Sequence, residues 1–375
     1  MAGRPWLTRG AVLAAFLVAT PPGGVPPASA STSARLVIDC RPSLEECWPT
    51  AFVFTPNGKQ VFYVERFTGQ IRRFTFKGRR DGRWGSVGPV DGDGERGTLG
   101  IALDPRWNKG PRQRWVYVFF TQAQPLENKI VRLRKKPKKP GFVRQELLSI
   151  RVDPPNSNHN GGPIHFGPDR KLYVVTGDQG RFPERSQDLA DPGGKVLRLN
   201  RNGGRPADNP IPGSLAYSFG HRNSFGFTFD PRTDRLWQTE NGPNCNDEVN
   251  LVVRGGNHAW GPDGTSCSGT PDVAETNRSG PDPKILPEVN YGSVLVPTGA
   301  VFCERCGLDP AVEGDLLVAT FGGQVRDLSL SASRDDVVDD TVLYQHDEGV
   351  LAMAARRSGQ LYFSDDDGIY RLVAA

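Results

Sequence analysis

The sequence is poor in methionine and, beyond its N-terminus, in long apolar segments. It has 2 methionines among 375 residues, and no apolar run is long enough to cross a bilayer as a helix. Amphipathic periodicity over more than three helical turns is also lacking. These absences predict a soluble mature protein with no membrane span. The net charge of +4 is too small to favour nucleic acid as a partner.

The N-terminus is typical of an export signal. Arg4 and Arg9 give a basic start, a short apolar run follows at residues 11–20, and small residues suited to cleavage occupy 28–30. The arginines are not adjacent, which disfavours a twin-arginine signal, and no cysteine is available for a lipid anchor. The alternatives are an uncleaved anchor or a misassigned start codon. We expect a secretory signal peptide at residues 1–30 and a secreted or periplasmic protein.

The cysteines come in an even number, six, which in an exported chain predicts disulfides. They fall into three sequence-local pairs, so the simplest connectivity is Cys40–Cys47, Cys245–Cys267 and Cys303–Cys306. The last pair has the Cys-x-x-Cys spacing of a redox motif or of half a metal site. A zinc site would need a second such pair nearby, and the sequence has none, so we favour a loop disulfide.

Six copies of one sequence phrase run along the chain. Each has an apolar strand, a turn often containing Asp-Pro or Gly, a strand rich in Tyr and Val, and a strand carrying a basic residue. The copies begin at Ala51, Leu99, Ile164, Phe225, Gly299 and Val350. Repetition at roughly 40–60 residues is typical of propellers, and a β-sandwich would not explain six matching units. We predict an all-β fold, a six-bladed β-propeller of short antiparallel strands, over residues 31–375.

One basic segment interrupts this pattern. Residues 132–139 (RLRKKPKK) lie between two strand-like runs and contain a proline. A solvated hairpin loop is the expected structure, and a surface for an anionic partner is the alternative.

Polar residues gather in three loops between the predicted strands. His159 lies between asparagines and is followed by two glycines, and Asp178 follows the next strand. An aspartate that accepts a hydrogen bond from one imidazole nitrogen leaves the other as a base. The alternative is a structural histidine in a turn. In the second loop Arg222 precedes a strand, where it could bind an anion or pair with a carboxylate between blades.

The third loop, residues 239–253, contains Glu240, Asp247 and Glu248 among Asn, Gly and Pro. Carboxylates and exposed carbonyls suit Ca²⁺ better than a transition metal. The spacing does not match an EF-hand, and an acidic turn braced by Cys245 is the alternative.

Taken in order, these loops carry a series of family motifs. The series is HNGG from His159, GDQG from Gly177, GKVLRLN from Gly194, DNP from Asp208, GHRN from Gly220, ENGP from Glu240, DEVN from Asp247 and GGN from Gly255. It resembles the soluble glucose/sorbosone dehydrogenases and is densest between His159 and Trp260. The resemblance implies a six-bladed propeller that holds pyrroloquinoline quinone (PQQ) and Ca²⁺. It implies oxidation of an aldose sugar, with the electrons passed to an acceptor that the sequence does not identify.

The resemblance also implies roles for individual residues. His159 would be the general base for the anomeric hydroxyl, and Asp178 would orient it. Arg222 would contact the cofactor and a substrate oxygen, with Asn223 beside it on the cofactor.

Two further roles concern calcium. The resemblance implies that the carbonyls of Gly242 and Pro243 hold the cofactor-bound Ca²⁺ and that Glu248 is a ligand of a second, structural Ca²⁺.

The chain departs from the family pattern at four places. Glu95 stands where members commonly have Gln, and His258 replaces a tyrosine. Residues 320–323 (TFGG) lack the basic residue expected in the fifth blade, and residues 349–351 (GVL) replace an Arg-x-Arg pair in the sixth. A tricarboxylate cofactor requires cationic partners. The cations that could replace them are Arg326, Arg356 and Arg357.

These departures leave alternative functions open. A non-catalytic propeller, similar to that of Hedgehog-interacting proteins, would bind a partner through its loops. A lactonase-type hydrolase would need carboxylates from several blades around one metal, whereas only the fourth blade has such a cluster. The retained His159, Asp178 and Arg222 favour the sugar dehydrogenase.

Overall fold

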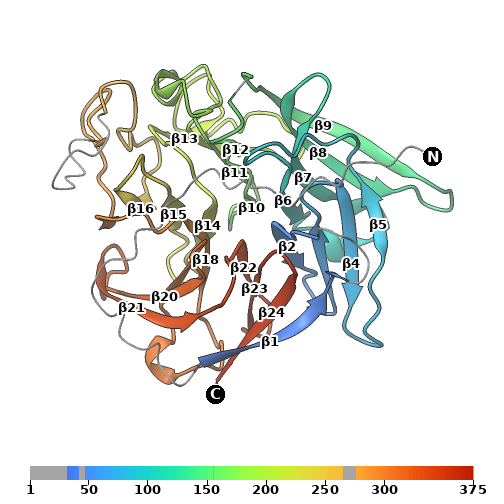
Figure 1. Ribbon diagram of the computed structural model, residues 1–375. Coiled ribbons are helices and arrows are strands. Elements are labelled where there is room, and N and C mark those ends of the chain that lie inside the picture. The colour runs from blue at the N-terminus through green and yellow to red at the C-terminus, as the bar shows by residue number, and fades with distance from the viewer. Residues whose placement is uncertain (1–31, 42–46, 155, 265–275, 375) are drawn as a thin grey trace, which may run out of the picture.

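The structure, a computed structural model, describes residues 32–41, 47–154, 156–264 and 276–374. The expected signal peptide and Cys267 lie outside these ranges. The described chain forms six four-stranded antiparallel sheets around a common centre (Figure 1). The predicted six-bladed β-propeller is therefore confirmed. Among the described residues, no helix has the length and apolar character needed to cross a membrane.

Five blades are built from four consecutive strands each. They are β2 (Ala51–Phe54), β3 (Gln60–Val64), β4 (Gln70–Thr75) and β5 (Arg83–Ser86); β6 (Thr98–Leu103), β7 (Val116–Gln122), β8 (Glu127–Lys135) and β9 (Phe142–Arg151); β10 (Ile164–Phe166), β11 (Leu172–Thr176), β12 (Lys195–Leu199) and β13 (Ala216–Phe219); β14 (Gly226–Phe229), β15 (Leu236–Glu240), β16 (Asp247–Val252) and β17 (Val289–Tyr291); β18 (Pro297–Phe302), β19 (Leu316–Thr320), β20 (Gln324–Leu330) and β21 (Val337–Gln345).

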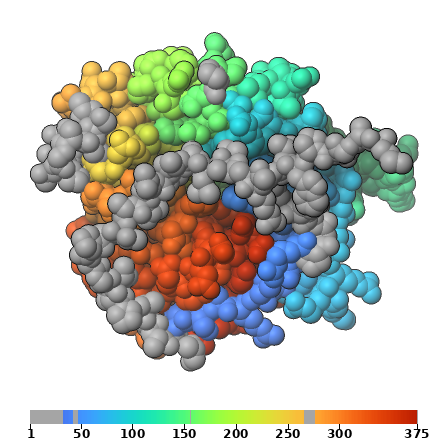
Figure 2. Space-filling view, viewed as in Figure 1, coloured from blue at the N-terminus to red at the C-terminus, as the bar shows by residue number. Residues whose placement is uncertain are grey.

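The sixth blade joins the two ends of the described chain. It contains β22 (Ala352–Ala355), β23 (Leu361–Ser364) and β24 (Gly368–Ala374), and β1 (Thr32–Asp39) pairs with β24 as its fourth strand. The blue N-terminal segment therefore borders the red last blade in the space-filling view (Figure 2). This closure by the N-terminal strand was not predicted, because β1 belongs to none of the six sequence phrases.

The first strand of each blade lies nearest the centre (Figure 1). The second strand is sandwiched between neighbouring blades. In β7, Val116, Val118 and Phe120 pack toward the first blade, and Tyr117 and Phe119 pack toward the third. All five side chains are fully buried, so both faces of the strand are apolar and the sequence does not alternate. This accounts for the continuous Tyr/Val-rich run in the repeated phrase.

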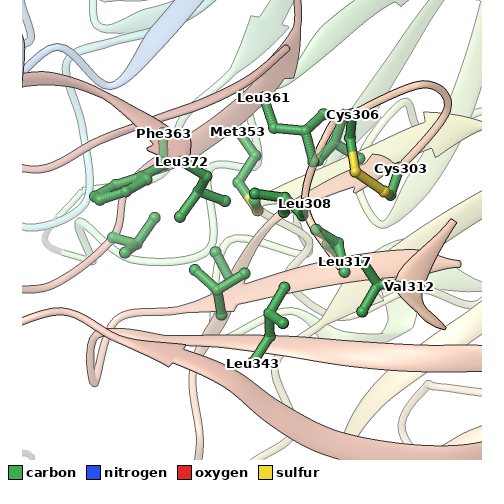
Figure 3. Packing of buried hydrophobic residues seen from close by; sticks show 14 residues of the cluster. Cys303, Cys306, Leu308, Val312, Leu317, Leu343, Met353, Leu361, Phe363 and Leu372 are labelled. Atoms are coloured by element: carbon green, nitrogen blue, oxygen red, sulfur yellow. A yellow bond between two sulfur atoms is a disulfide. The ribbon is translucent and has the colours of Figure 1, made fainter. Parts of the chain in front are cut away.

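Each pair of adjacent blades encloses its own hydrophobic cluster. The cluster between blades five and six includes Leu317, Met353 and Phe363, and it is covered at one side by the Cys303–Cys306 disulfide (Figure 3). Six such clusters replace the single core of a sandwich. Because burying one large apolar side chain contributes about 1.5–3 kcal/mol, each cluster supplies substantial cohesion between its two blades.

Two of the expected disulfides lie within the described residues, Cys40–Cys47 and Cys303–Cys306. Both sulfurs of the Cys-x-x-Cys pair are committed to this bond, which disfavours the alternative of a metal half-site. Cys245 is also disulfide-bonded, and its expected partner, Cys267, lies outside the described residues.

The basic segment forms a hairpin, as expected, although part of it is strand. Strand β8 continues to Lys135, and the exposed turn at residues 136–141 leads into β9. Arg132 and Arg134 stack over the ring of Trp115.

A small cavity of about 40 Å³ lies among the first strands on the propeller axis. His165 lines it and packs edge-on against Phe227 at a ring distance of 4.8 Å. His159, Asp178 and Arg222 do not line this cavity, so the predicted chemistry lies elsewhere.

Candidate active site

The predicted site residues lie at one end of the propeller, which we call the mouth. At this end the first strand of each blade begins and the second strand ends. His159 precedes β10 and Asp178 follows β11 in the third blade, whereas Arg222 precedes β14 and Asn241 follows β15 in the fourth. Chain direction within two adjacent blades therefore brings these loops together.

His159 and Asp178 form the hydrogen bond expected from their spacing. Nδ1 of His159 lies 2.6 Å from Oδ1 of Asp178. The backbone of His159 is left-handed, with φ 56°. A Cβ atom on Gly177 would collide with the carbonyl of His159, so glycine is needed where the two loops touch.

Asp178 has a separate donor for each oxygen. Oδ1 also accepts a hydrogen bond from the backbone N–H of Gly180 at 2.7 Å, and Oδ2 accepts one from Nε1 of Trp260 at 2.8 Å. Burial by itself raises the pKa of Asp178, but the hydrogen bond and charge of His159, together with Arg222, bring the pKa below its ordinary value. The carboxyl group is therefore ionised and oriented.

The other four histidines lack this arrangement. His221 uses both ring nitrogens, with Glu240 at 2.9 Å and Ser218 at 2.8 Å. The ring of His258 stacks on that of His221 at 4.5 Å, and burial lowers the pKa of His258 well below its usual range.

His346 forms a second His–Asp pair, in the sixth blade, but both of its nitrogens are occupied. Nε2 lies 2.9 Å from Asp365, and Nδ1 lies 3.3 Å from the hydroxyl of Tyr344. His165 lies at the cavity on the propeller axis, where burial lowers its pKa to about 4. His159 alone combines a carboxylate on one nitrogen with a second nitrogen that bonds to no described residue.

Arg222 is held at the mouth by main-chain oxygens. One terminal nitrogen, Nη1, donates to the carbonyl of Asn241 at 2.8 Å and to that of Gly242 at 2.6 Å. The guanidinium stacks over Trp260 at 5.3 Å, and its own backbone N–H donates to the carboxylate of Glu240. Burial lowers the pKa of Arg222, because the guanidinium is largely shielded from water.

Glu95, one of the departures from the family pattern, points into the same mouth. Its Oε2 accepts hydrogen bonds from the backbone N–H of His159 at 2.7 Å and from Nδ2 of Asn223 at 3.2 Å. A single carboxylate of the second blade thus contacts loops of the third and fourth blades.

Asp247 and Glu248, two carboxylates of the acidic loop in the fourth blade, have different surroundings. Asp247 braces the loop, because it accepts the backbone N–H groups of Gly242, Leu295 and Val296. Glu248 is buried, and among the described residues its donors are the side-chain amides of Asn250 and Asn277.

Burial raises the pKa of both Glu240 and Glu248 to about 8. A carboxyl group in such surroundings favours its neutral form unless a cation lies beside it.

The described residues offer a polar ligand several unused groups. Four buried atoms at the mouth have no hydrogen-bond partner among them: Gln179 Oε1, Arg222 Nε, Asn223 Oδ1 and Asn241 Oδ1. The carbonyl of Gly242 retains a second lone pair, and that of Pro243 accepts no hydrogen bond from the described chain. Oxygen donors of this kind suit Ca²⁺. The third- and fourth-blade side of the mouth therefore fits an anionic cofactor bound with calcium.

The opposite side of the mouth is acidic. The sixth blade presents Glu348 and Asp366, whose charges interact with each other. Arg326 pairs with Asp340 at 2.8 Å, and Arg356 and Arg357 bond to main-chain carbonyls of the β2–β3 turn at the far end of the strands. These three arginines therefore do not replace the missing cations.

Residues 44–373 of the chain match the family model described as Glucose / Sorbosone dehydrogenase. Quinoprotein glucose dehydrogenase B of Acinetobacter calcoaceticus is 31% identical over 287 residues, which are 67% of this chain and 58% of that protein. The chain thus spans just over half the length of that relative.

A solved structure gives a fuller match. The PQQ-bound form of the aldose sugar dehydrogenase of Streptomyces coelicolor is 27% identical, with a TM-score of 0.74, and the match covers 93% of this chain and 100% of that one. Mouse Hedgehog-interacting protein is 32% identical over 126 residues, 30% of this chain and 17% of that protein. From the family match, which spans nearly the whole described chain, the protein belongs to the glucose/sorbosone dehydrogenase family.

Proposed function

We propose that the protein is an exported quinoprotein oxidoreductase that oxidises the anomeric hydroxyl of an aldose sugar with PQQ and calcium. The observation that carries the proposal is the pairing of His159 with Asp178 at 2.6 Å, which leaves Nε2 of His159 without a partner among the described residues. Arg222 and Asn223 lie at the same mouth, on the loop of the next blade.

His159 moves the proton in this proposal. Because Asp178 is ionised and faces Nδ1, the imidazole carries its proton on Nδ1 and offers the lone pair of Nε2. Nε2 takes the proton of the anomeric hydroxyl, and the charge of Asp178 stabilises the resulting imidazolium. Trp260 and Gly180 hold the carboxylate in place while this charge develops.

The cofactor site lies on the third- and fourth-blade side of the mouth. Arg222 and Asn223 would hold PQQ, and the carbonyls of Gly242 and Pro243 would hold its Ca²⁺. The bound PQQ would supply the hydride acceptor for the sugar, and Ca²⁺ would supply a Lewis acid for the quinone. Glu248, a buried carboxylate at the end of the same loop, is our proposed ligand for a second, structural Ca²⁺.

Reconstitution tests this function. The purified protein is loaded with PQQ and Ca²⁺ and assayed for dye reduction with a panel of aldoses. Activity is expected in the wild type and should be lost in His159→Ala. The matched control is His346→Ala, which breaks the other His–Asp pair and should leave turnover in place. Absence of PQQ binding and of dye reduction in the wild type would refute the proposal.

We also propose export with cleavage after Ala30, leaving residues 31–375 as the mature propeller domain. The disulfides support this, because such bonds persist in oxidising compartments. N-terminal sequencing of secreted material should begin at Ser31. An intact N-terminus on exported protein would contradict the cleavage.

A second candidate is a propeller that binds a protein partner through its loops. The acidic sixth-blade mouth favours it, because Glu348 and Asp366 stand where carboxylates of a cofactor would need cations. In that case PQQ should not bind at micromolar concentration, whereas the fold remains intact.

A further inference from the structure

Glu95 is an acidic side chain at the mouth, beside His159, that the proposed reaction does not use. It precedes β6 in the second blade, and its backbone N–H donates to the carbonyl of Ser157 at 3.1 Å, in the loop that carries His159. Its Oε2 then accepts from His159 and Asn223. Backbone and side chain together fix the carboxylate between the predicted base and the predicted cofactor loop.

The second oxygen of Glu95 is unused. No described residue donates a hydrogen bond to Oε1, and this atom is not among the fully buried unpartnered atoms. Within the described ranges, no Lys or Arg lies within ion-pair distance of the carboxylate, although its field acts on Arg222. A hydrogen-bond acceptor with a full negative charge therefore remains open to a ligand beside His159.

We propose that Glu95 is a specificity-determining residue that selects neutral and amino-substituted aldoses and excludes acidic sugars. The inference rests on the proposed function. An ionised carboxylate only accepts hydrogen bonds, so it can bind a sugar hydroxyl or, more strongly, an ammonium group. A uronic acid carries its carboxylate on C6, away from the anomeric hydroxyl, and it would still bring a further negative charge into a mouth that holds Glu95 and Asp178.

Glu95→Gln separates charge from shape. The amide oxygen of glutamine can still accept from His159 and Asn223, so the mouth loops keep their anchor while the negative charge disappears. Glu146→Gln is the matched control, because it removes the same charge from the exposed strand β9.

The test compares glucose, glucosamine and glucuronate at slightly acidic pH in the PQQ- and Ca²⁺-loaded enzyme. The wild type should prefer glucosamine to glucuronate by at least about tenfold in kcat/KM. Glu95→Gln should reduce this ratio by about tenfold, mainly through KM. High salt should reduce the wild-type ratio as well, and Glu146→Gln should match the wild type.

The outcomes distinguish the inference from the function on which it rests. A wild type that oxidises glucose but does not discriminate between the two charged sugars overturns the inference alone, even if Glu95→Gln fails to fold. An unchanged ratio in a folded Glu95→Gln does the same. A wild type that oxidises no sugar overturns both.

Discussion

The two oxygens of Asp178 have different donors, and this makes an amide replacement informative. Oδ1 faces Nδ1 of His159 and the N–H of Gly180, and Oδ2 faces Nε1 of Trp260. Asparagine has one acceptor oxygen. In one orientation its NH₂ group faces the N–H of Trp260, so that two donors meet without an acceptor. In the other it opposes the N–H of Gly180 and donates to His159, which moves the imidazole proton to Nε2 and removes the base.

The size of the effect follows from these contacts. Asp178→Asn should lower kcat by about 10²–10⁴-fold, because the charge beside the imidazolium is lost and part of the protein holds the wrong tautomer. Two buried donors that face each other cost about 1–3 kcal/mol, equivalent to about 5- to 150-fold in rate. Trp260→Phe removes one of those donors and keeps an aromatic ring under Arg222.

Asp178→Asn/Trp260→Phe should therefore be about 5- to 150-fold more active than Asp178→Asn, although Trp260→Phe alone reduces activity. The assay is steady-state dye reduction in the loaded enzyme, with the tautomer of His159 followed by nitrogen NMR. Asp178→Asn/Trp115→Phe is the control, because Trp115 lies in the second blade and stacks on Arg132. Additive losses in the double variant would refute the assignment of donors.

Three further predictions concern stability and cofactor binding. Burial lowers the pKa of His165 from the ordinary 6.5 to about 4 in the folded protein. Between these values the unfolded chain binds more protons than the folded protein, so the free energy of unfolding falls by about 3 kcal/mol as the pH drops from 6.5 to 4. His165→Leu should remove this loss, and unfolding curves whose pH dependence equals that of the wild type would contradict it. Arg222→Lys cannot keep both carbonyl contacts and should weaken PQQ binding by about tenfold or more, as measured by calorimetric titration; unchanged affinity would exclude Arg222 from the site. Leu351→Arg, which places a cation in the sixth-blade mouth, should tighten PQQ binding by about tenfold, and unaltered binding would show that the cofactor does not reach this blade.

The inner three strands of each blade were predictable from the sequence, but the outermost strands were not. The buried second strands are continuous apolar runs, such as β7 and β19, and these are strong signals. The fourth strands, β9 and β21 among them, are only partly buried and mix polar with apolar residues. They show no regular alternation and no continuous buried apolar run, and only pairing with the third strand reveals them.

The site shows a similar division. His159 and Asp178 lie on either side of one hairpin, so their contact follows from local sequence. The contacts of Trp260 with Asp178 and of Glu95 with His159 cross between loops remote in sequence. The family pattern marked Glu95 as a departure, whereas a single tryptophan in a loop had no pattern to distinguish it.

The pairing of β1 with β24 has a consequence for folding during synthesis. Thr32 faces Ala374 in the register of this pair, so the first described strand emerges from the ribosome long before its partner exists. Until then an unpaired strand edge remains open to other chains. The loop that follows β1 bonds to the last blade as well, from Cys40 to Asp367 and from Trp48 to Asp366. Closure of the ring must therefore await completion of the chain, and the first strand has to be protected from other chains until then.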